Sequence, residues 1–124
     1  MKQPLALLLY EKLLFGGQLL NRLQDMGYRV QPVPVPDDLV PTAEREKPLL
    51  AFIDLEPHFE KICDAIAGLR RNPATAYIPV IVFAAAQGTE AQELARKRGA
   101  TVVVPHSVLL QHLDQFMDQT LAVD

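Results

Sequence analysis

The sequence predicts a doubly wound α/β fold with a five-stranded parallel sheet in the order 2-1-3-4-5. Short apolar runs alternate with stretches of helical periodicity along the chain. The run over 49–54 is apolar on both faces, which is typical of a central strand in a parallel sheet. The run over 28–33 contains Pro32, with Pro34 and Pro36 just beyond it. Because proline cannot donate to a ladder, this second strand is expected at an edge.

Local signals place the elements of the first half. The apolar run Leu5–Leu9 predicts the first strand. Helical periodicity over 13–26 predicts a helix, and Gly27 is a natural stop for it. The segment 31–48 carries five prolines and a Glu/Arg/Lys cluster, so it is interpreted as a stiff, solvated connection, with at most a short helix over 41–47.

Five further elements complete the alternation. They are, in order, a helix over 59–69, a strand over 79–83, a helix over 89–99, a strand over 101–104 and a helix from Ser107. Thr89 and Gln92 form a capping-box signature, and Gly99 ends that helix. Ser107 is a good N-cap. Cys63 lies on the apolar stripe of the helix over 59–69, so we expect a packed thiol.

Composition limits what the chain can be. Its 124 residues, 49% of them hydrophobic and 22% charged, predict one domain over residues 1–124. A net charge of −3 does not favour direct nucleic-acid binding. The single cysteine fits a reducing cytoplasm. No apolar run approaches the roughly 20 residues of a membrane span. We therefore expect a cytoplasmic domain that contacts neither nucleic acid nor membrane.

Asp54 is the most informative residue for function, because it ends the apolar run over 49–54. Ligand and reaction sites of such sheets form at the carboxyl ends of the strands, where the strand order reverses. In the predicted order this crevice lies over the ends of the first and third strands, at Tyr10, Glu11 and Asp54. An aspartate there can bind a cation, accept a phosphoryl group, or do neither.

The order and spacing of several landmarks resemble a response-regulator receiver domain of the CheY-like family. The landmarks are Asp54, Gly27-Tyr28-Arg29-Val30, Ile78-Pro79-Val80-Ile81 and Gly99-Ala100. The resemblance covers nearly all of the chain. It implies a flavodoxin-like receiver fold, a non-enzymatic role in two-component signal transduction or a phosphorelay, and Asp54 as the phosphoacceptor candidate.

Four positions depart from the family's active-site pattern. Tyr10 stands where the first of two adjacent acidic residues is usual, and its ring is a candidate cover for the pocket. Ala84 replaces the Thr or Ser that ends the fourth strand, and Val103 replaces the aromatic switch residue. His106 falls at the lysine position in an ungapped comparison. Since phosphoryl transfer depends on such charges and donors, a degenerate receiver, or pseudo-receiver, is predicted.

The resemblance also implies a cation site, formed by Glu11, Asp54 and the backbone carbonyl of Glu56, with Mg²⁺ as the candidate cofactor. Two alternatives stay open. One is a receiver that remains competent for phosphorylation at Asp54. The other is a small-molecule or metal-binding α/β protein that uses Glu11, Asp54, His58 and His106. No glycine-rich phosphate loop, nucleophile elbow or zinc motif supports an enzyme.

The last predicted helix carries more apolar residues than one core stripe requires. The interface candidates are Leu110, Leu113, Met117 and Leu121. Leu110 and Met117 are the members expected to be exposed, and such a patch can mark a homodimer or a contact with a signalling partner. Without a hydroxyl at 84 or an aromatic at 103, this binding is expected to be constitutive. Ordinary core packing is the alternative.

Overall fold

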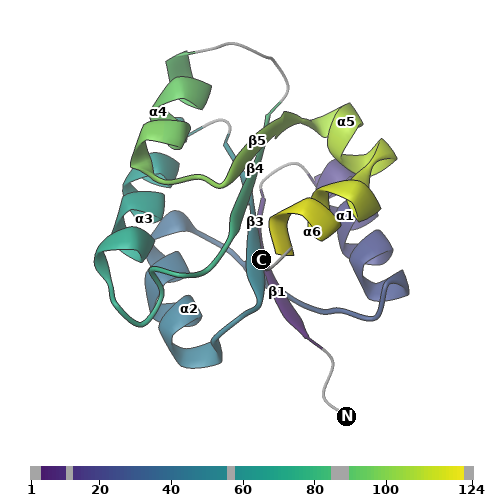
Figure 1. Ribbon diagram of the computed structural model, residues 1–124, viewed down its shortest axis with the longest axis horizontal. Coiled ribbons are helices and arrows are strands. Elements are labelled where there is room, and N and C mark those ends of the chain that lie inside the picture. The colour runs from purple at the N-terminus through teal and green to yellow at the C-terminus, as the bar shows by residue number, and fades with distance from the viewer. Residues whose placement is uncertain (1–3, 11–12, 56–57, 85–89, 122–124) are drawn as a thin grey trace.

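The computed structural model describes residues 4–10, 13–55, 58–84 and 90–121 of the chain. Strands and helices alternate along it (Figure 1). The elements are, in order, β1 (Leu5–Leu9), α1 (Leu13–Asp25), β2 (Arg29–Val33), the 3₁₀ helix η1 (Pro36–Asp38), α2 (Leu39–Glu46), β3 (Leu50–Asp54), α3 (Phe59–Arg71), β4 (Val80–Ala84), α4 (Glu90–Arg98), β5 (Val102–Pro105), α5 (His106–Gln111) and α6 (Leu113–Leu121).

The five strands form one parallel sheet in the order β2-β1-β3-β4-β5, which confirms the predicted fold class and strand order. The placement of β2 at an edge is confirmed as well. The N–H of Arg29 donates to the carbonyl oxygen of Pro4 at 2.8 Å. Since successive residues of a strand alternate in direction, Pro32 faces away from β1. Its missing N–H therefore costs the sheet no ladder bond.

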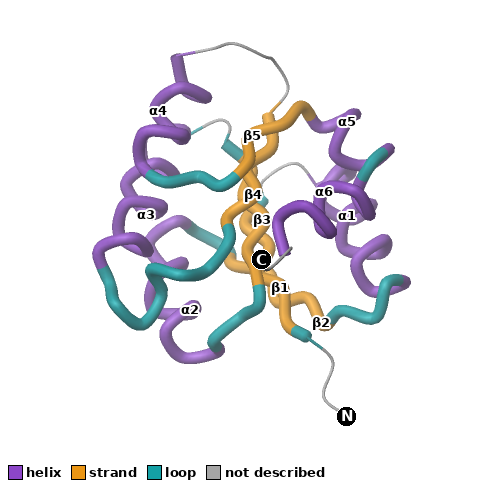
Figure 2. Tube along the Cα trace, in the orientation of Figure 1, coloured by secondary structure: helices purple, strands orange, loops and turns teal. Residues whose placement is uncertain are grey.

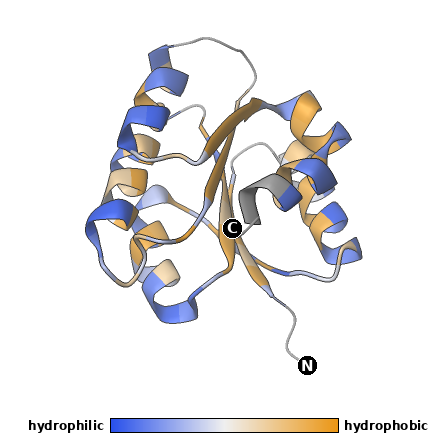
Figure 3. Cartoon of the chain, in the orientation of Figure 1, coloured by the Kyte–Doolittle hydropathy of each residue, from blue (hydrophilic) through white to orange (hydrophobic). Residues whose placement is uncertain are grey.

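Helices cover both faces of the sheet, as Figure 2 shows. Side chains of α2, α3 and α4 share one buried cluster with one face of the strands, and side chains of α1, α5 and α6 share a second cluster with the other face. All residues of β1, β3 and β4 are buried, as expected for central strands. In Figure 3 the central strands are coloured mostly hydrophobic, and the helices on both sides of them carry hydrophobic and hydrophilic residues.

The segment 31–48 is more ordered than the sequence interpretation allowed. Past the end of β2 it forms η1 and then α2, and Leu39, Thr42 and Ala43 of α2 are buried. The short helix expected over 41–47 is present as α2, but the prediction of a solvated connection was wrong for the second half of the segment. The prolines were interpreted as breaking regular structure, but Pro36 occupies the first position of η1, where its fixed φ favours the start of a helix.

The last predicted helix is two helices, α5 and α6, separated at His112 (φ −123°, ψ 31°). The expectation that Met117 is exposed was wrong: it is 2% exposed and Leu113 is fully buried, both in the cluster shared with α1. Leu110 is half-buried. The side chain of Leu121 lies outside the described residues. The helix began at His106 and not after a Ser107 cap, and Thr89 falls outside the described part.

Candidate functional site

Asp54 is the last residue of β3, beside the point where the strand order reverses between β1 and β3. Its Cα pairs with that of Phe83 in β4, and the N–H of the next residue, Leu55, donates to the carbonyl oxygen of Phe83 at 3.0 Å. This pairing fixes the backbone on both sides of the carboxylate. The side chain of Asp54 is only 1% exposed. A reagent can therefore reach this carboxylate only if a neighbouring group moves.

His106 is such a neighbour. It is the first residue of α5 and follows directly on Pro105, which pairs with Ala84 at the end of β4. Its Nε2 lies 3.9 Å from Oδ1 of Asp54, and its side chain is 18% exposed. This separation exceeds a hydrogen bond but suits an ion pair when the imidazole is protonated. The structure thus brings together two of the residues that the sequence singled out.

Two phenylalanines, which the sequence interpretation did not single out, contact the imidazole. The ring centroid of Phe15 in α1 lies 4.5 Å from that of His106, and the centroid of Phe83 lies 5.4 Å from it. The two phenyl rings are 4.9 Å apart and tilted by 43°. These distances are typical of favourable aromatic pairs. Phe83 carried a usable signal, because its place on β4, one residue before Ala84, puts it beside the site.

Two more of the four positions that depart from the receiver pattern in sequence hold aliphatic side chains. Ala84 ends β4, is 3% exposed and offers no hydroxyl. Val103 lies in the middle of β5, is half-buried and packs against the cluster shared with α2, α3 and α4. Neither side chain can donate a hydrogen bond to a phosphoryl group.

Tyr10 follows β1 directly, and its half-buried ring packs with the cluster on the α1 side of the sheet. The ring lies against Gly16 of α1, where any Cβ would overlap it. Tyr10 is thus a packing residue between the end of β1 and α1. Since Tyr10 has no carboxylate, Glu11 is the remaining candidate for an acidic cation ligand after β1, and it lies outside the described residues.

The described residues do not by themselves make a metal site. Glu11 and Glu56, two of the three predicted cation ligands, lie outside them. Within the described part of the chain, no three His, Cys, Asp or Glu residues gather closely enough to hold a metal ion. His58 is exposed at the N-cap of α3. Of the three predicted cation ligands, Asp54 is the one within the described residues, and its carboxylate lies next to His106.

Cys63 is fully buried in α3, as expected for a packed thiol. Burial raises the pKa of the thiol above its ordinary value, and Asp64 adds to this while Arg98 opposes it. A raised thiol pKa means less thiolate at neutral pH, so Cys63 is a poor nucleophile.

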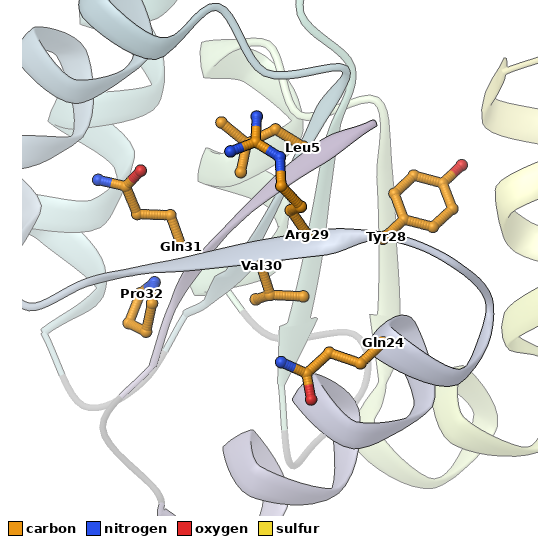
Figure 4. A pocket seen from close by; sticks show the side chains of 7 residues that line it. All are labelled: Leu5, Gln24, Tyr28, Arg29, Val30, Gln31 and Pro32. Atoms are coloured by element: carbon orange, nitrogen blue, oxygen red, sulfur yellow. The ribbon is translucent and has the colours of Figure 1, made fainter. Parts of the chain in front are cut away.

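A hollow of about 570 Å³ lies beside β2, and Asp54 is not among the residues that line it (Figure 4). It is lined by Leu5, Gln24, Tyr28, Arg29, Val30, Gln31 and Pro32. Of the peptide groups at this edge, Val30 can offer an outward N–H, whereas Pro32 cannot. A partner strand would therefore find an interrupted ladder here, which is a common protection of sheet edges.

Comparison with known proteins identifies the fold. No family model and no curated protein matches the sequence. Among solved structures, a protein from Chloroflexus aurantiacus described as a response regulator superposes with a TM-score of 0.87 at 17% identity, covering 98% of this chain and 100% of that chain. The receiver domain of a sensor histidine kinase from Pseudomonas aeruginosa, with magnesium in its active-site cleft, gives 0.86 at 18% identity over 97% and 98%. A BeF3-activated receiver domain from Klebsiella pneumoniae gives 0.82 at 16% over 96% and 99%.

The chain therefore has the receiver-domain fold of response regulators, as the sequence resemblance implied. In the described residues no helix is long and apolar enough to cross a membrane.

Proposed function

We propose that this chain is a receiver-like module of signal transduction, which acts mainly through protein contacts and whose Asp54 is phosphorylated weakly or not at all. One observation carries the proposal: the Asp54 side chain is 1% exposed and its Oδ1 lies 3.9 Å from Nε2 of His106. A phosphodonor must approach in line with the attacking oxygen, and the covered carboxylate does not allow this approach.

The chemistry of the surrounding groups supports the same proposal. A transferring phosphoryl group is stabilised by donors and cations that are already in place. At this site Ala84 supplies no hydroxyl, and an imidazole is a shorter and only partly charged substitute for a lysine ammonium. The module is accordingly a binding protein and not an enzyme. Its one free cysteine, which is buried, fits a reducing cytoplasm.

The test is intact-mass measurement after treatment with acetyl phosphate and Mg²⁺, together with beryllofluoride binding. We expect no stoichiometric adduct in the wild type. The pair Ala84→Thr/His106→Lys restores the missing hydroxyl and cation, so it should react faster if Glu11, Asp54 and Glu56 hold Mg²⁺. An adduct that forms readily in the wild type and disappears in Asp54→Asn would contradict the proposal.

The second candidate is a receiver that is competent for phosphorylation at Asp54. It is favoured by the place of Asp54 at the end of β3 in a fold whose neighbours include a magnesium-bound and a BeF3-activated receiver. The mass measurement separates the two candidates. A metal-binding protein that uses His58 is less well supported, because His58 is exposed and belongs to no metal-binding group in the described residues.

For partners, we propose a signalling protein or a second copy of the chain, bound through the last two helices. With Leu113 and Met117 in the core, Leu110 is the described apolar candidate that remains. A half-buried leucine on α5 can gain further apolar contact when a partner covers it.

A further inference from the structure

Three elements meet at the imidazole of His106. Phe15 comes from α1, Phe83 from β4, and His106 itself is the first residue of α5. The centroid distances of 4.5 Å for Phe15–His106 and 5.4 Å for Phe83–His106 place both phenyl rings in direct contact with the imidazole. We call these three side chains the aromatic latch. Of the three, His106 lies next to Asp54, with Nε2 at 3.9 Å from Oδ1, and the side chain of Asp54 is 1% exposed.

The two phenylalanines differ in how firmly they are held. Phe83 is fully buried and lies in a central strand whose backbone pairs with β3 and β5. It cannot leave without opening the sheet. Phe15 lies in the first turn of α1 and is half-buried. Phe15 is thus the aromatic residue of the latch that can be substituted while the sheet stays intact.

We propose that Phe15 is the positioning residue that keeps this site closed. Its ring holds the imidazole of His106 over Asp54, and through His106 it holds the start of α5. This inference rests on the proposed function for the closed state of Asp54. Beyond the proposed function, it identifies the residue that closes the site and the contact that joins the site to the last two helices. That link replaces the route through a hydroxyl at 84 and an aromatic at 103, which this chain lacks.

The link has a structural basis on both sides of His106. Pro105, just before it, pairs with Ala84 at the end of β4, so β5 is anchored in the sheet. After it, Leu109 of α5 is fully buried in the cluster that also includes α1. Figure 1 shows α5 and α1 on the same side of the sheet. A closed latch therefore keeps α5 in one position, which agrees with constitutive binding.

Carbethoxylation by diethyl pyrocarbonate, followed residue by residue with peptide mass spectrometry, tests the inference. The chain has three histidines, and His58 and His112 are exposed references within the same molecule. In the wild type we expect His106 to react roughly tenfold or more slowly than both. In Phe15→Ala this protection should be lost. Phe15→Leu, which keeps most of the volume without a ring, should give an intermediate rate, and Phe15→Tyr should keep the protection.

Two controls separate the latch from other causes of protection. Phe116→Ala removes another half-buried aromatic residue of the same cluster, from α6, and should leave His106 protected. Asp54→Asn removes the charge that faces the imidazole and should also leave it protected, because the rings provide the cover. The inference fails if His106 reacts like His112 in the wild type, if neither Phe15→Ala nor Phe15→Leu speeds its labelling, or if either control exposes it equally.

The outcome is independent of the phosphorylation test. A protected His106 in a wild type that is phosphorylated stoichiometrically would overturn the proposed function and with it the closed state of Asp54, and would leave only the hold of Phe15 on His106. A readily labelled His106 in a wild type that stays unphosphorylated would overturn the latch and leave the proposed function standing.

Discussion

The ring of Tyr10 lies directly over Gly16: a Cβ added to Gly16 would stand 2.6 Å from Cγ of Tyr10, and closer still to two other ring atoms. Real Cβ atoms do not approach so closely, so an alanine at position 16 would displace the ring of Tyr10 from its packing. Gly16 is thus required for space. It allows α1 to pack against the residue that replaces a family carboxylate after β1.

Replacing Gly16 by alanine should therefore destabilise the protein by about 1–2 kcal/mol, because overpacking outweighs the helix-propensity gain of alanine. Gly17→Ala is the matched control. It lies next in the same helix with nothing within 4 Å of its Cβ, so it should be neutral or stabilising by up to about 1 kcal/mol. Urea unfolding measures both. In the Tyr10→Ala background, Gly16→Ala should cost less than it does in the wild type, and equal stability of Gly16→Ala and Gly17→Ala would rule out the steric explanation.

Arg70 binds the segments that lead into β4 and β5. It donates to the carbonyl oxygens of Ala76 and Ile78, each at 2.7 Å, and to that of Gly99 at 3.0 and 2.8 Å. Burial lowers the pKa of the guanidinium, but arginine stays charged at any accessible pH. Arg70→Met should cost about 2–4 kcal/mol, because charged hydrogen bonds to three carbonyls are lost. Arg71→Met, at an exposed neighbour, should change the free energy of unfolding by less than about 0.5 kcal/mol.

The fold was predictable because its signals are local and redundant. The apolar run that becomes β3 could only be central, and Pro32 could only be tolerated at an edge. The proximity of His106 to Asp54 was predictable in part. An ungapped comparison placed it at the family's lysine position, and the ends of parallel strands gather at one edge of the sheet.

The contacts around the imidazole were not predictable from the sequence. Phe15 reaches His106 because of the angle at which α1 crosses the sheet, which no residue pattern states. The burial of Met117 was missed for a related reason. How wide a stripe a helix buries depends on how it lies between its neighbours, and here a break at His112 sets the direction of α6.

Cys63 should make stability depend on pH in the alkaline range. Burial raises the pKa of its thiol in the folded state, so the folded protein retains a proton that the unfolded chain releases. The contribution of the protonated thiol to stability is fully present below the pKa of the thiol in the unfolded chain, about 8.5. It is lost as the pH rises through the higher pKa of the thiol in the folded protein. We expect the free energy of unfolding to fall as the pH rises above about 8.5, by up to about 1.4 kcal/mol per pH unit.

Urea titrations at several pH values measure this slope, with Cys63→Ala as the control variant. The alanine variant is expected to be less stable at pH 7 but flatter above pH 8.5. The phenol of Tyr28, whose pKa is raised by burial and then by Asp118, adds a similar decline near pH 10 in both proteins. If the free energies of unfolding of the wild type and of Cys63→Ala fall in parallel as the pH rises, the thiol is not the cause of the decline.

The last prediction concerns Leu110, which is half-buried on α5 while the exposed residues around it are polar. If a second copy or a signalling partner binds through the last helices, Leu110→Glu should weaken binding about tenfold or more. This corresponds to about 1.5 kcal/mol of lost apolar burial. Gln111→Glu adds the same charge at the exposed neighbouring position and should bind normally. Because the closed latch fixes α5 whether or not Asp54 is modified, Asp54→Asn should bind like the wild type.

Sedimentation velocity over a concentration series measures the homodimer, and isothermal calorimetry measures the affinity for a partner once one is identified. Thermal melting confirms that each variant is folded. Equal association of Leu110→Glu and Gln111→Glu would move the interface away from α5.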